Sequence, residues 1–459
     1  KKTDYSGFLI LTNSEIEIQQ NNSTQYIDEG LGIPDEDTET NTLQTSNLAI
    51  GKFTIKHRPN LNNQLDYEIL SRITEENQDQ NYLSLQSQSL DPLLGSIDQI
   101  EDVETYNISQ NLNYYYTLDD KNIFAFEAQH VIKNEDPFYN ALLENDISDN
   151  QEPFDGPAIG LGLDNSLDNY NIAQERKVKS NQLDAKLDYW NILNIKSDLN
   201  FTLGAIYSNQ KFDSEIFQFL DSGTFYPTPV INEGLNYNEI DYTFKDLYLG
   251  VHYRIKSGKF TISPGFTAHA YDSKNTQFGT DYSDSFFKLL PDFNVILQLK
   301  NSESIRLNYA MQTQFTDVTK LARGLVLNNY NSIFSGDQEL QNALSHNINL
   351  IYHSFNLFNY TNVFARLSYN KSIDQIRNLT SFESVIATSS PFNSSFADET
   401  FSAMARYQRS FGKVRTTLST NYNYSKFNQF IQSINNPSLS ENFSQNYKGS
   451  IRTLFKTAP

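Results

Sequence analysis

Apolar and polar residues alternate with a period of two along residues 286–315, on both sides of the polar turn Lys300–Glu303. Before the turn, apolar side chains take every second position, at Phe287, Leu289, Pro291, Phe293, Val295, Leu297 and Leu299. After the turn, they continue at Ile305, Leu307, Tyr309, Met311 and Phe315. A period of two is that of a β-strand whose two faces differ. The segment is therefore predicted to be a β-hairpin.

The composition of the two faces indicates where such a hairpin lies. A strand of a soluble β-sandwich also alternates, so the period alone does not decide. Here Asn, Gln, Arg, Lys and Asp occupy one face across the middle of both strands, while the other face is apolar and ends in aromatic residues. Strands with lipid on one side and water on the other carry this pattern, which favours a transmembrane β-barrel.

The same hairpin recurs along the chain, with short polar turns between its strands. We place these turns at Arg58–Asn62, Asp119–Asn122, Asn191–Asn194, Lys256–Lys259, Lys300–Glu303, Asn356–Asn359 and Ser410–Lys413. A first strand before a loop at residues 21–41 and a last strand around Tyr447–Phe455 bring the total to about sixteen. The predicted fold class is all-β, a transmembrane antiparallel up-and-down β-barrel formed by one domain of residues 1–459.

The unequal lengths of the connections predict an orientation. Outer-membrane barrels have short periplasmic turns and long extracellular loops, and this chain alternates short turns with long polar segments. The long segments are expected to lie outside the cell and to form any ligand or partner surface. They are centred on Asp28–Glu39, Asp146–Asp168, Asp221–Asn238 and Thr316–Gln341.

Aromatic residues gather beside the short turns. Their positions are Tyr189, Trp190, Tyr253, Phe260, Phe355, Phe358, Tyr360, Tyr407 and Phe411. Aromatic rings concentrate where a membrane meets water, so these residues are expected to form the periplasmic girdle of the barrel. The alternative is an aromatic core cluster of a soluble β protein.

Composition agrees with a barrel and excludes other classes. Mean hydropathy is −0.54, and no run approaches the roughly 20 apolar residues that a spanning helix needs. An aromatic content of 13% suits strands and interfacial girdles. The absence of Cys excludes disulfides and thiolate metal sites, and a net charge of −20 makes nucleic acid an unexpected partner.

The sequence shows no motif of a catalytic or cofactor site. Its six histidines are scattered without metal-ligand spacing, and it has no nucleophile elbow, phosphate-binding glycine loop or dinucleotide fingerprint. We therefore expect neither an enzyme nor a bound cofactor. Asp146, Asp149, Asn150 and Asp155 offer oxygen ligands of the kind that Ca²⁺ prefers, but their spacing is not that of a calcium loop, and a solvated acidic loop is the simpler interpretation.

One stretch is unusually apolar for a predicted loop. Residues Ile216–Tyr226 contain Phe217, Phe219, Phe225 and Tyr226. An exposed apolar patch marks a binding surface, so these four side chains are a candidate extracellular contact for a ligand or partner. Packing of the loop against the mouth of the barrel is the alternative.

Five short segments resemble a known family. They are Thr261–Gly265, Phe287–Asp292, Ser304–Ala310, Gly336–Leu340 and Ser345–Asn347. Together they look like the barrel of the TonB-dependent-receptor-like outer membrane proteins of Bacteroidetes, although Asp337-Gln338 stands where that family has Asn-Pro. The clear resemblance covers roughly residues 260–370.

This resemblance implies a function and an incomplete chain. Receptors of this kind have an N-terminal plug inside a barrel of twenty-two strands, so the sequence would be the barrel portion, without its start and a few final strands. The implied function is import of a glycan, peptide or metal chelate across the bacterial outer membrane. Implied partners are outer-membrane lipid and lipopolysaccharide, the TonB system and a surface lipoprotein. The alternative is a structural or accessory barrel subunit of a larger secretion or biogenesis complex.

Overall fold

A computed structural model describes residues 2–25, 35–87, 92–144, 163, 169–220, 223–225, 230–231, 234–330, 332–383, 386–431 and 433–453. Nearly all of these residues are β-strand. None of the helices in these ranges has the length and apolar character of a membrane span.

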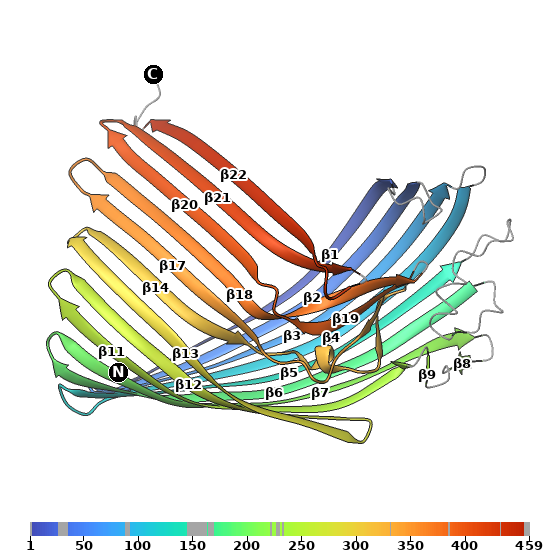
Figure 1. Ribbon diagram of the computed structural model, residues 1–459, viewed down its shortest axis with the longest axis horizontal. Coiled ribbons are helices and arrows are strands. Elements are labelled where there is room, and N and C mark those ends of the chain that lie inside the picture. Colours follow the sequence, from blue (N-terminus) through green and yellow to red (C-terminus); the bar gives the residue numbers. More distant parts are fainter. Residues whose placement is uncertain are drawn as a thin grey trace.

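Sixteen long strands form one antiparallel meander, in which each strand pairs with the next along the chain (Figure 1). The first eight are β1 (Thr3–Gln25), β2 (Asp35–Asn60), β3 (Asn63–Ser87), β4 (Pro92–Thr117), β5 (Asn122–Glu144), β6 (Asn169–Asn194), β7 (Ser197–Leu220) and β11 (Tyr237–Ser257). The other eight are β12 (Phe260–Gln277), β13 (Thr280–Lys300), β14 (Glu303–Gln314), β17 (Ala343–Asn356), β18 (Thr361–Glu383), β20 (Asp398–Phe411), β21 (Val414–Ile431) and β22 (Ser438–Thr453). The expected all-β meander and its strand number are confirmed in the described residues.

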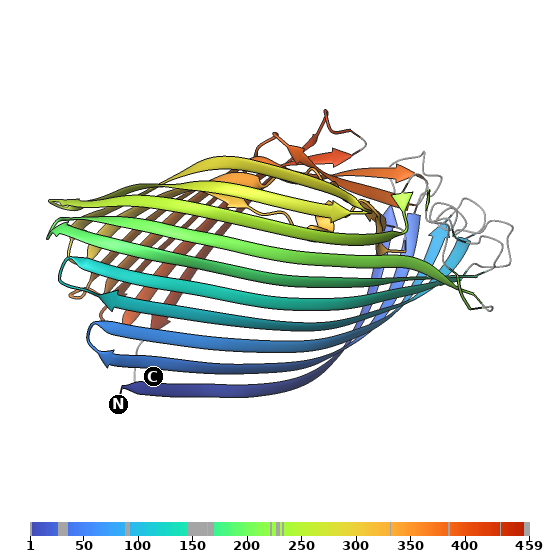
Figure 2. The same cartoon turned by 90° about the horizontal axis from the view of Figure 1, so that it is seen from below.

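The meander curls round an interior, and β1 and β22 form its two edges (Figures 1 and 2). In the ranges given above, no residue of β1 pairs with β22. Almost every residue of β1 and every residue of β22 but one is exposed, on both faces of the strand. The middle strands differ, because one of their faces meets the interior.

The outward face carries the apolar band that the alternation predicts. In β7, Leu203 and Tyr207 point outward and are 53% and 45% exposed, whereas Ser208 and Phe212 point inward and are buried. In β13, Phe287 and Leu289 are 66% and 55% exposed. Aromatic residues close the band near the short turns, where Tyr189 stacks on Phe124 of the neighbouring strand with centroids 4.9 Å apart. Such large apolar side chains face outward because hydrocarbon surrounds this part of the wall.

The short turns predicted from the sequence all lie at one end of the meander (Figure 1). Two of them contain a glycine in the left-handed region, Gly258 at φ 57° and Gly412 at φ 61°, as tight hairpins require. At another, the Asp119 carboxylate accepts hydrogen bonds from the backbone N–H of Lys121 and Asn122, both at 2.8 Å. The hydrogen bond from the Asn122 side chain and the bond from the Lys121 backbone lower the pKa of Asp119.

The turn placed at Asn191–Asn194 is wrong by a few residues. These residues complete β6, and the turn is formed by Ile195 and Lys196. Asn194 explains the difference, because its side chain accepts a hydrogen bond from the Lys196 backbone at 2.8 Å. An asparagine that supports a turn from the last strand position looks in sequence like a residue of the turn itself.

The other end of the sheet differs more from the prediction, because strand pairing continues into segments that were expected to be loops. Residues 21–25 pair with 35–39, so the described part of the loop expected at 21–41 continues the ladder between β1 and β2. Strands β12 and β13 are joined by only Phe278 and Gly279. Beyond the hydrocarbon, the outer face no longer has to be apolar, so alternation ends while backbone pairing continues. At about 3.3 Å per residue, the 26 residues of β2 are far longer than an apolar band about 25 Å tall requires, even when strongly tilted.

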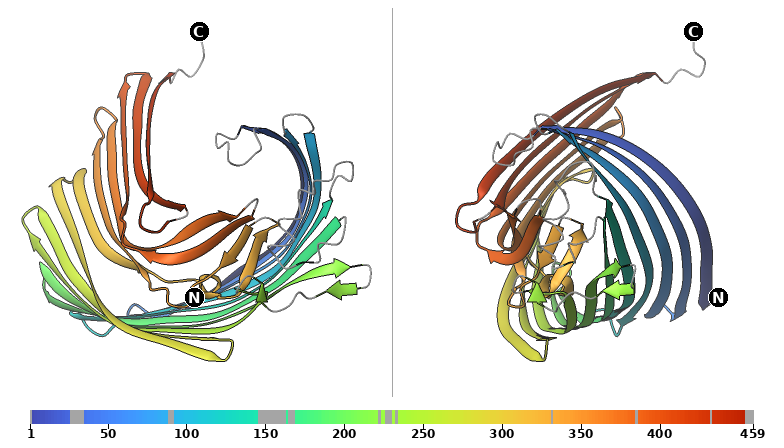
Figure 3. Two further views of the ribbon diagram at one scale, coloured as in Figure 1. Left: turned by 45° about the vertical axis from the view of Figure 1, so that its right-hand side comes forward. Right: turned by 90° about the vertical axis from the view of Figure 1, so that its right-hand side faces the viewer.

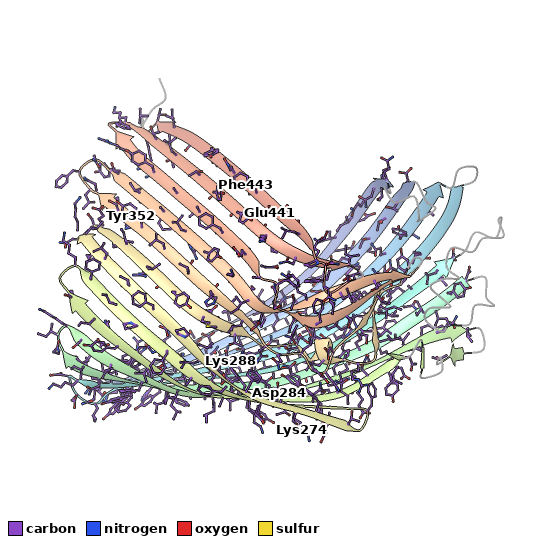
Figure 4. The ribbon with its side chains drawn as sticks, in the orientation of Figure 1. Lys274, Asp284, Lys288, Tyr352, Glu441 and Phe443 are labelled. Atoms are coloured by element: carbon purple, nitrogen blue, oxygen red, sulfur yellow. The ribbon has the colours of Figure 1, made fainter. Side chains whose placement is uncertain are left out.

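Charged residues mark the level at which the outward face leaves the hydrocarbon. Ion pairs join neighbouring strands there, at Lys177–Asp136, Lys211–Asp241, Lys245–Asp272 and Lys274–Asp281, with N–O distances of 2.8, 3.0, 3.5 and 2.9 Å. Figure 4 shows Lys274 at this end of the sheet and Tyr352 near the short turns. Exposed pairs of this kind add little stability, so we interpret them as a boundary of the apolar band.

Replacing Leu307 by Arg is expected to impair barrel assembly. Leu307 pairs with Val295 on the outward face, and a charge there near mid-membrane costs about 2–4 kcal/mol. Asn308→Arg is the matched control, because Asn308 faces the interior, where it bonds to Asn294. A heat-modifiability gel reports assembly. Equal loss of the folded form in both variants would contradict the face assignment.

Cysteine labelling tests the predicted orientation, and the chain has no cysteine of its own. An impermeant maleimide applied to intact cells is expected to label Glu239→Cys, at the end with charged outward residues, and to spare Asp120→Cys in a short turn. Both positions are exposed. Labelling of Asp120→Cys alone would reverse the topology.

Candidate functional site

The connection between β14 and β17 folds into the interior of the sheet. This inner segment, residues 315–330 and 332–342, contains the 3₁₀ turn η2 (Val318–Leu321) and the strands β15 (Leu325–Asn329) and β16 (Ser332–Ser335). Figure 3 shows it enclosed by the curved wall. The segment Thr316–Gln341, which was expected to lie outside the cell and to form part of a ligand or partner surface, packs against inward-facing side chains of the wall. Its place outside the cell stays a prediction.

Two buried apolar clusters hold the inner segment against the wall. In one, the segment contributes Val318, Leu321, Ala322 and Val326, which pack on Phe212, Ile240, Tyr242, Phe244 and Tyr271. In the other, Leu327 and Ile333 pack with residues of β4, β5, β6 and β7, among them Tyr139, Tyr170, Ile172 and Ile216. These wall residues lie beyond the apolar outer band, so the end of the barrel opposite the short turns has a packed core.

The inner segment also belongs to a second layer of strands that crosses the interior. Strand β15 pairs with β16, and β16 pairs in parallel with β19 (Ile386–Ser394). Strand β19 pairs with the far half of β18, Gln375–Glu383, after the near half of β18 has paired with β20 in the wall. Phe430 and Ile431 of β21 complete the layer against Leu379 and Thr380. We call these strands the inner layer.

Three buried amide side chains of the wall bind the backbone of the inner segment. Gln277 donates to the carbonyl of Leu321 at 2.7 Å and accepts from the N–H of Arg323 at 3.1 Å. Asn238 accepts from the N–H of Gly324 at 2.7 Å and donates to the carbonyl of Leu325 at 3.2 Å. Gln174 accepts from the N–H of Leu327 at 3.1 Å. Each amide is at most 3% exposed. These side chains supply the hydrogen bonds that a neighbouring strand would otherwise give to the buried backbone of the inner segment.

Gly324 is required where the inner segment crosses β11. A Cβ there would lie 2.1 Å from the carbonyl oxygen of Tyr237 and 2.6 Å from Oδ1 of Asn238. Any other residue would therefore separate the segment from its hydrogen-bond partner.

A cavity of about 490 Å³ lies between η2, the far half of β18 and the end of β21. Its polar lining consists of Lys320, Arg377, Asn378, Thr380, Asn428 and Gln429. Ile376, Phe430 and Ile431 supply the apolar part. The volume is that of a small-molecule site, and such sites combine apolar walls with a few placed polar groups.

Asp398 organises one wall of this cavity. Its carboxylate, 5% exposed, forms an ion pair with Arg377 and accepts hydrogen bonds from the backbone and side-chain N–H groups of Asn428, both at 3.0 Å. Burial lowers the pKa of Arg377, which still leaves an arginine charged near neutral pH. Phe430 packs edge-on against Phe392, with centroids 4.9 Å apart. The position of the guanidinium is therefore fixed before any ligand arrives.

Nearer the short turns, the inward face of the wall carries ionisable pairs. His269 lies 2.9 Å from the buried carboxylate of Asp246, and His252 lies 2.8 Å from the half-buried carboxylate of Asp292. Arg254 donates to Asp198 at 2.6 Å. In the part of the chain that the structure describes, no three His, Asp or Glu residues come together as a metal site.

A family model for the outer membrane protein beta-barrel family matches residues 138–457. This chain belongs to that family. The match covers most of the sequence and places the protein in the outer membrane as an integral barrel. Comparison with curated protein sequences gives no match.

Solved structures with a similar fold include the following three. The copper transporter OprC matches with a TM-score of 0.54 and 10% identity, over 98% of this chain and 66% of its own. FpvAI in complex with pyocin S2 matches with a TM-score of 0.49 and 12% identity, over 99% of this chain and 60% of its own. The transporter YddB from Escherichia coli has a TM-score of 0.45 and 12% identity, over 95% of this chain and 66% of its own. The chain thus spans less than two thirds of the length of these proteins. The expected resemblance to outer-membrane receptor barrels is confirmed for the fold, and origin in Bacteroidetes stays a prediction.

The aromatic residues chosen from the sequence as a binding loop are in part strand. Phe217 and Phe219 belong to β7, where their rings meet edge to face at 5.2 Å, and Phe217 is only 5% exposed. Phe225 ends the short strand β8 (Gly223–Phe225), which pairs back on β7. Tyr226 lies outside the described residues, as do Asp146, Asp149, Asn150 and Asp155. The stretch is therefore a strand end and hairpin, and its role in binding stays a prediction. Nearby, β9 (Val230–Ile231) and β10 (Gly234–Leu235) form a separate short pair.

The inner segment and the cavity were not identified from the sequence, although the apolar content of the segment indicates that it is buried. Between Phe315 and Asn342 it contains apolar residues at Val318, Leu321, Leu325, Val326, Leu327, Ile333 and Phe334. A solvated loop rarely contains so many apolar residues, whereas a segment that packs inside the barrel requires them.

Replacing Gln277 by Leu is expected to loosen the inner segment. The substitution leaves the Leu321 carbonyl and the Arg323 N–H buried without partners, at a cost of about 1–3 kcal/mol. Hydrogen exchange should therefore accelerate at residues 321–327. Gln298→Leu is the control, because Gln298 is exposed near a short turn. Unchanged exchange in Gln277→Leu would show that the apolar clusters alone hold the segment.

Proposed function

We propose that this protein is the barrel of an outer-membrane import receptor, which takes a polar nutrient into the cell. The observation that carries the proposal is the likeness of its fold to the copper transporter OprC over 98% of the chain, at a TM-score above one half. Membership in the outer membrane β-barrel family supports it. Catalysis is no part of this proposal.

The interior supports selective import rather than free diffusion. The inner segment occupies the lumen at one end and is held by two apolar clusters and three buried amides. A passive pore needs an open aqueous lumen. Here a solute entering from the end opposite the short turns meets the inner layer and its cavity first.

Substrate and partners follow from this proposal. A polar solute such as a glycan, peptide or metal chelate suits a lumen wall made of amides and paired charges. The inner segment occupies the lumen at one end, so the proposal includes energy coupling through the TonB system and capture of the solute by a surface lipoprotein. Lipid and lipopolysaccharide are the expected surroundings of the apolar band.

A deletion strain tests import. Removal of the full-length gene is expected to reduce uptake of one class of polar nutrient at least tenfold, and the intact gene should restore it. A protonophore should abolish the restored uptake, because energy-coupled import depends on the proton gradient.

The same strain can contradict the proposal. Unchanged uptake across sugars, peptides and metal chelates, together with stoichiometric recovery of partner proteins after mild detergent extraction, would favour a structural or accessory subunit instead.

A further inference from the structure

The cavity beside η2 differs in charge from the rest of this acidic chain. Its lining contains two cations, Lys320 and Arg377, and no carboxylate, while the chain as a whole carries −20. Asp398 is not part of the lining, and its carboxylate forms an ion pair with Arg377 and accepts a hydrogen bond from Asn428. Among the residues that the structure describes, no carboxylate forms an ion pair with Lys320. Because Asp398 neutralises Arg377, the net positive charge of the cavity lining comes from Lys320.

We propose that this cavity binds an anionic group, a carboxylate or a phosphate, of the solute that the barrel imports. This inference rests on the proposed import function and specifies its substrate class. Arginine matches the planar, two-oxygen geometry of both anions, and a lysine adds a mobile point charge.

Two features argue that the cavity is built for a ligand. The Arg377 guanidinium is held by a buried carboxylate, and that carboxylate is held in turn by Asn428, so the cation is oriented in advance. An oriented donor loses less entropy on binding. The volume of about 490 Å³ accommodates a hexose with a charged substituent and its water.

The two cations come from different parts of the fold. Lys320 belongs to η2 of the inner segment, and the next residue, Leu321, is bound by Gln277 of the wall. Arg377 belongs to β18, which leaves the wall to join the inner layer. An anion between them bridges the inner segment and β18, so occupancy of the cavity should steady the segment as well.

Three sugars that differ only at C6 provide the test. Glucose carries a neutral hydroxyl group there, glucuronate a carboxylate and glucose 6-phosphate a phosphate. Calorimetry on the purified full-length protein in detergent is expected to give at least tenfold tighter binding for one or both anionic sugars than for glucose. The stronger of the two identifies the anion. Equal affinity for all three sugars, or no binding by any of them, would overturn the inference.

Variants separate the cavity from the rest of the barrel. Lys320→Gln should weaken binding of the anionic sugar at least fivefold. The pair Arg377→Gln with Asp398→Asn, which leaves no unpaired buried charge, should weaken it further. Lys300→Gln, in a short turn, should bind like the wild type. A heat-modifiability gel confirms that each variant is assembled. Undiminished binding in the assembled cavity variants would place the anion elsewhere and refute the assignment.

Binding and import are measured separately, so the two proposals can fail separately. Anion-selective binding without uptake in cells would leave the inference standing and overturn the import function. Uptake without preference for an anionic substrate would do the reverse.

Discussion

The structure depends on one constraint, which is that backbone N–H and C=O groups in hydrocarbon must be paired within the protein. A meander of neighbouring strands satisfies this pairing without long connections, and it does so wherever the side chains point. The outward side chains then follow the surroundings. Leu203 and Phe287 meet lipid, whereas Lys211 and Asp241 on the same outer face meet water and each other. Backbone pairing continues unbroken where the outer face passes from lipid to water, so the strands are much longer than the apolar band.

This constraint explains which parts of the fold could be predicted from the sequence. Where lipid forces the outer face to be apolar, alternation is strict, and the hairpins around Lys300–Glu303 and Ser410–Lys413 were located correctly. Beyond the lipid both faces are polar, and a strand there has no period to detect. A segment such as residues 35–41 then matches the pattern of a loop, although it pairs along its whole length with β1 and β3.

The candidate site could not be predicted for a different reason. Gln174, Asn238 and Gln277 sit at inward positions of their strands, where any polar residue satisfies the pattern of a wall facing water. Their role depends on a segment that is distant in sequence and returns beside them. The apolar content of that segment was visible, but its partners, such as Phe212 and Tyr271, look like ordinary interior residues until the two are brought together.

The inner segment and the cavity form one unit in physical terms. Gln277 fixes the backbone on both sides of Ala322, and this places Lys320 at the cavity. On the opposite side, β18 can carry Arg377 inward only because it leaves the wall after Ser372, its last pairing with β20, and continues beside β19. A wall strand that stayed straight would leave the guanidinium at the wall and the inner segment without its parallel neighbour β19. The bend in β18 and the docking of the inner segment thus support each other, and the pair of cations exists only where both occur.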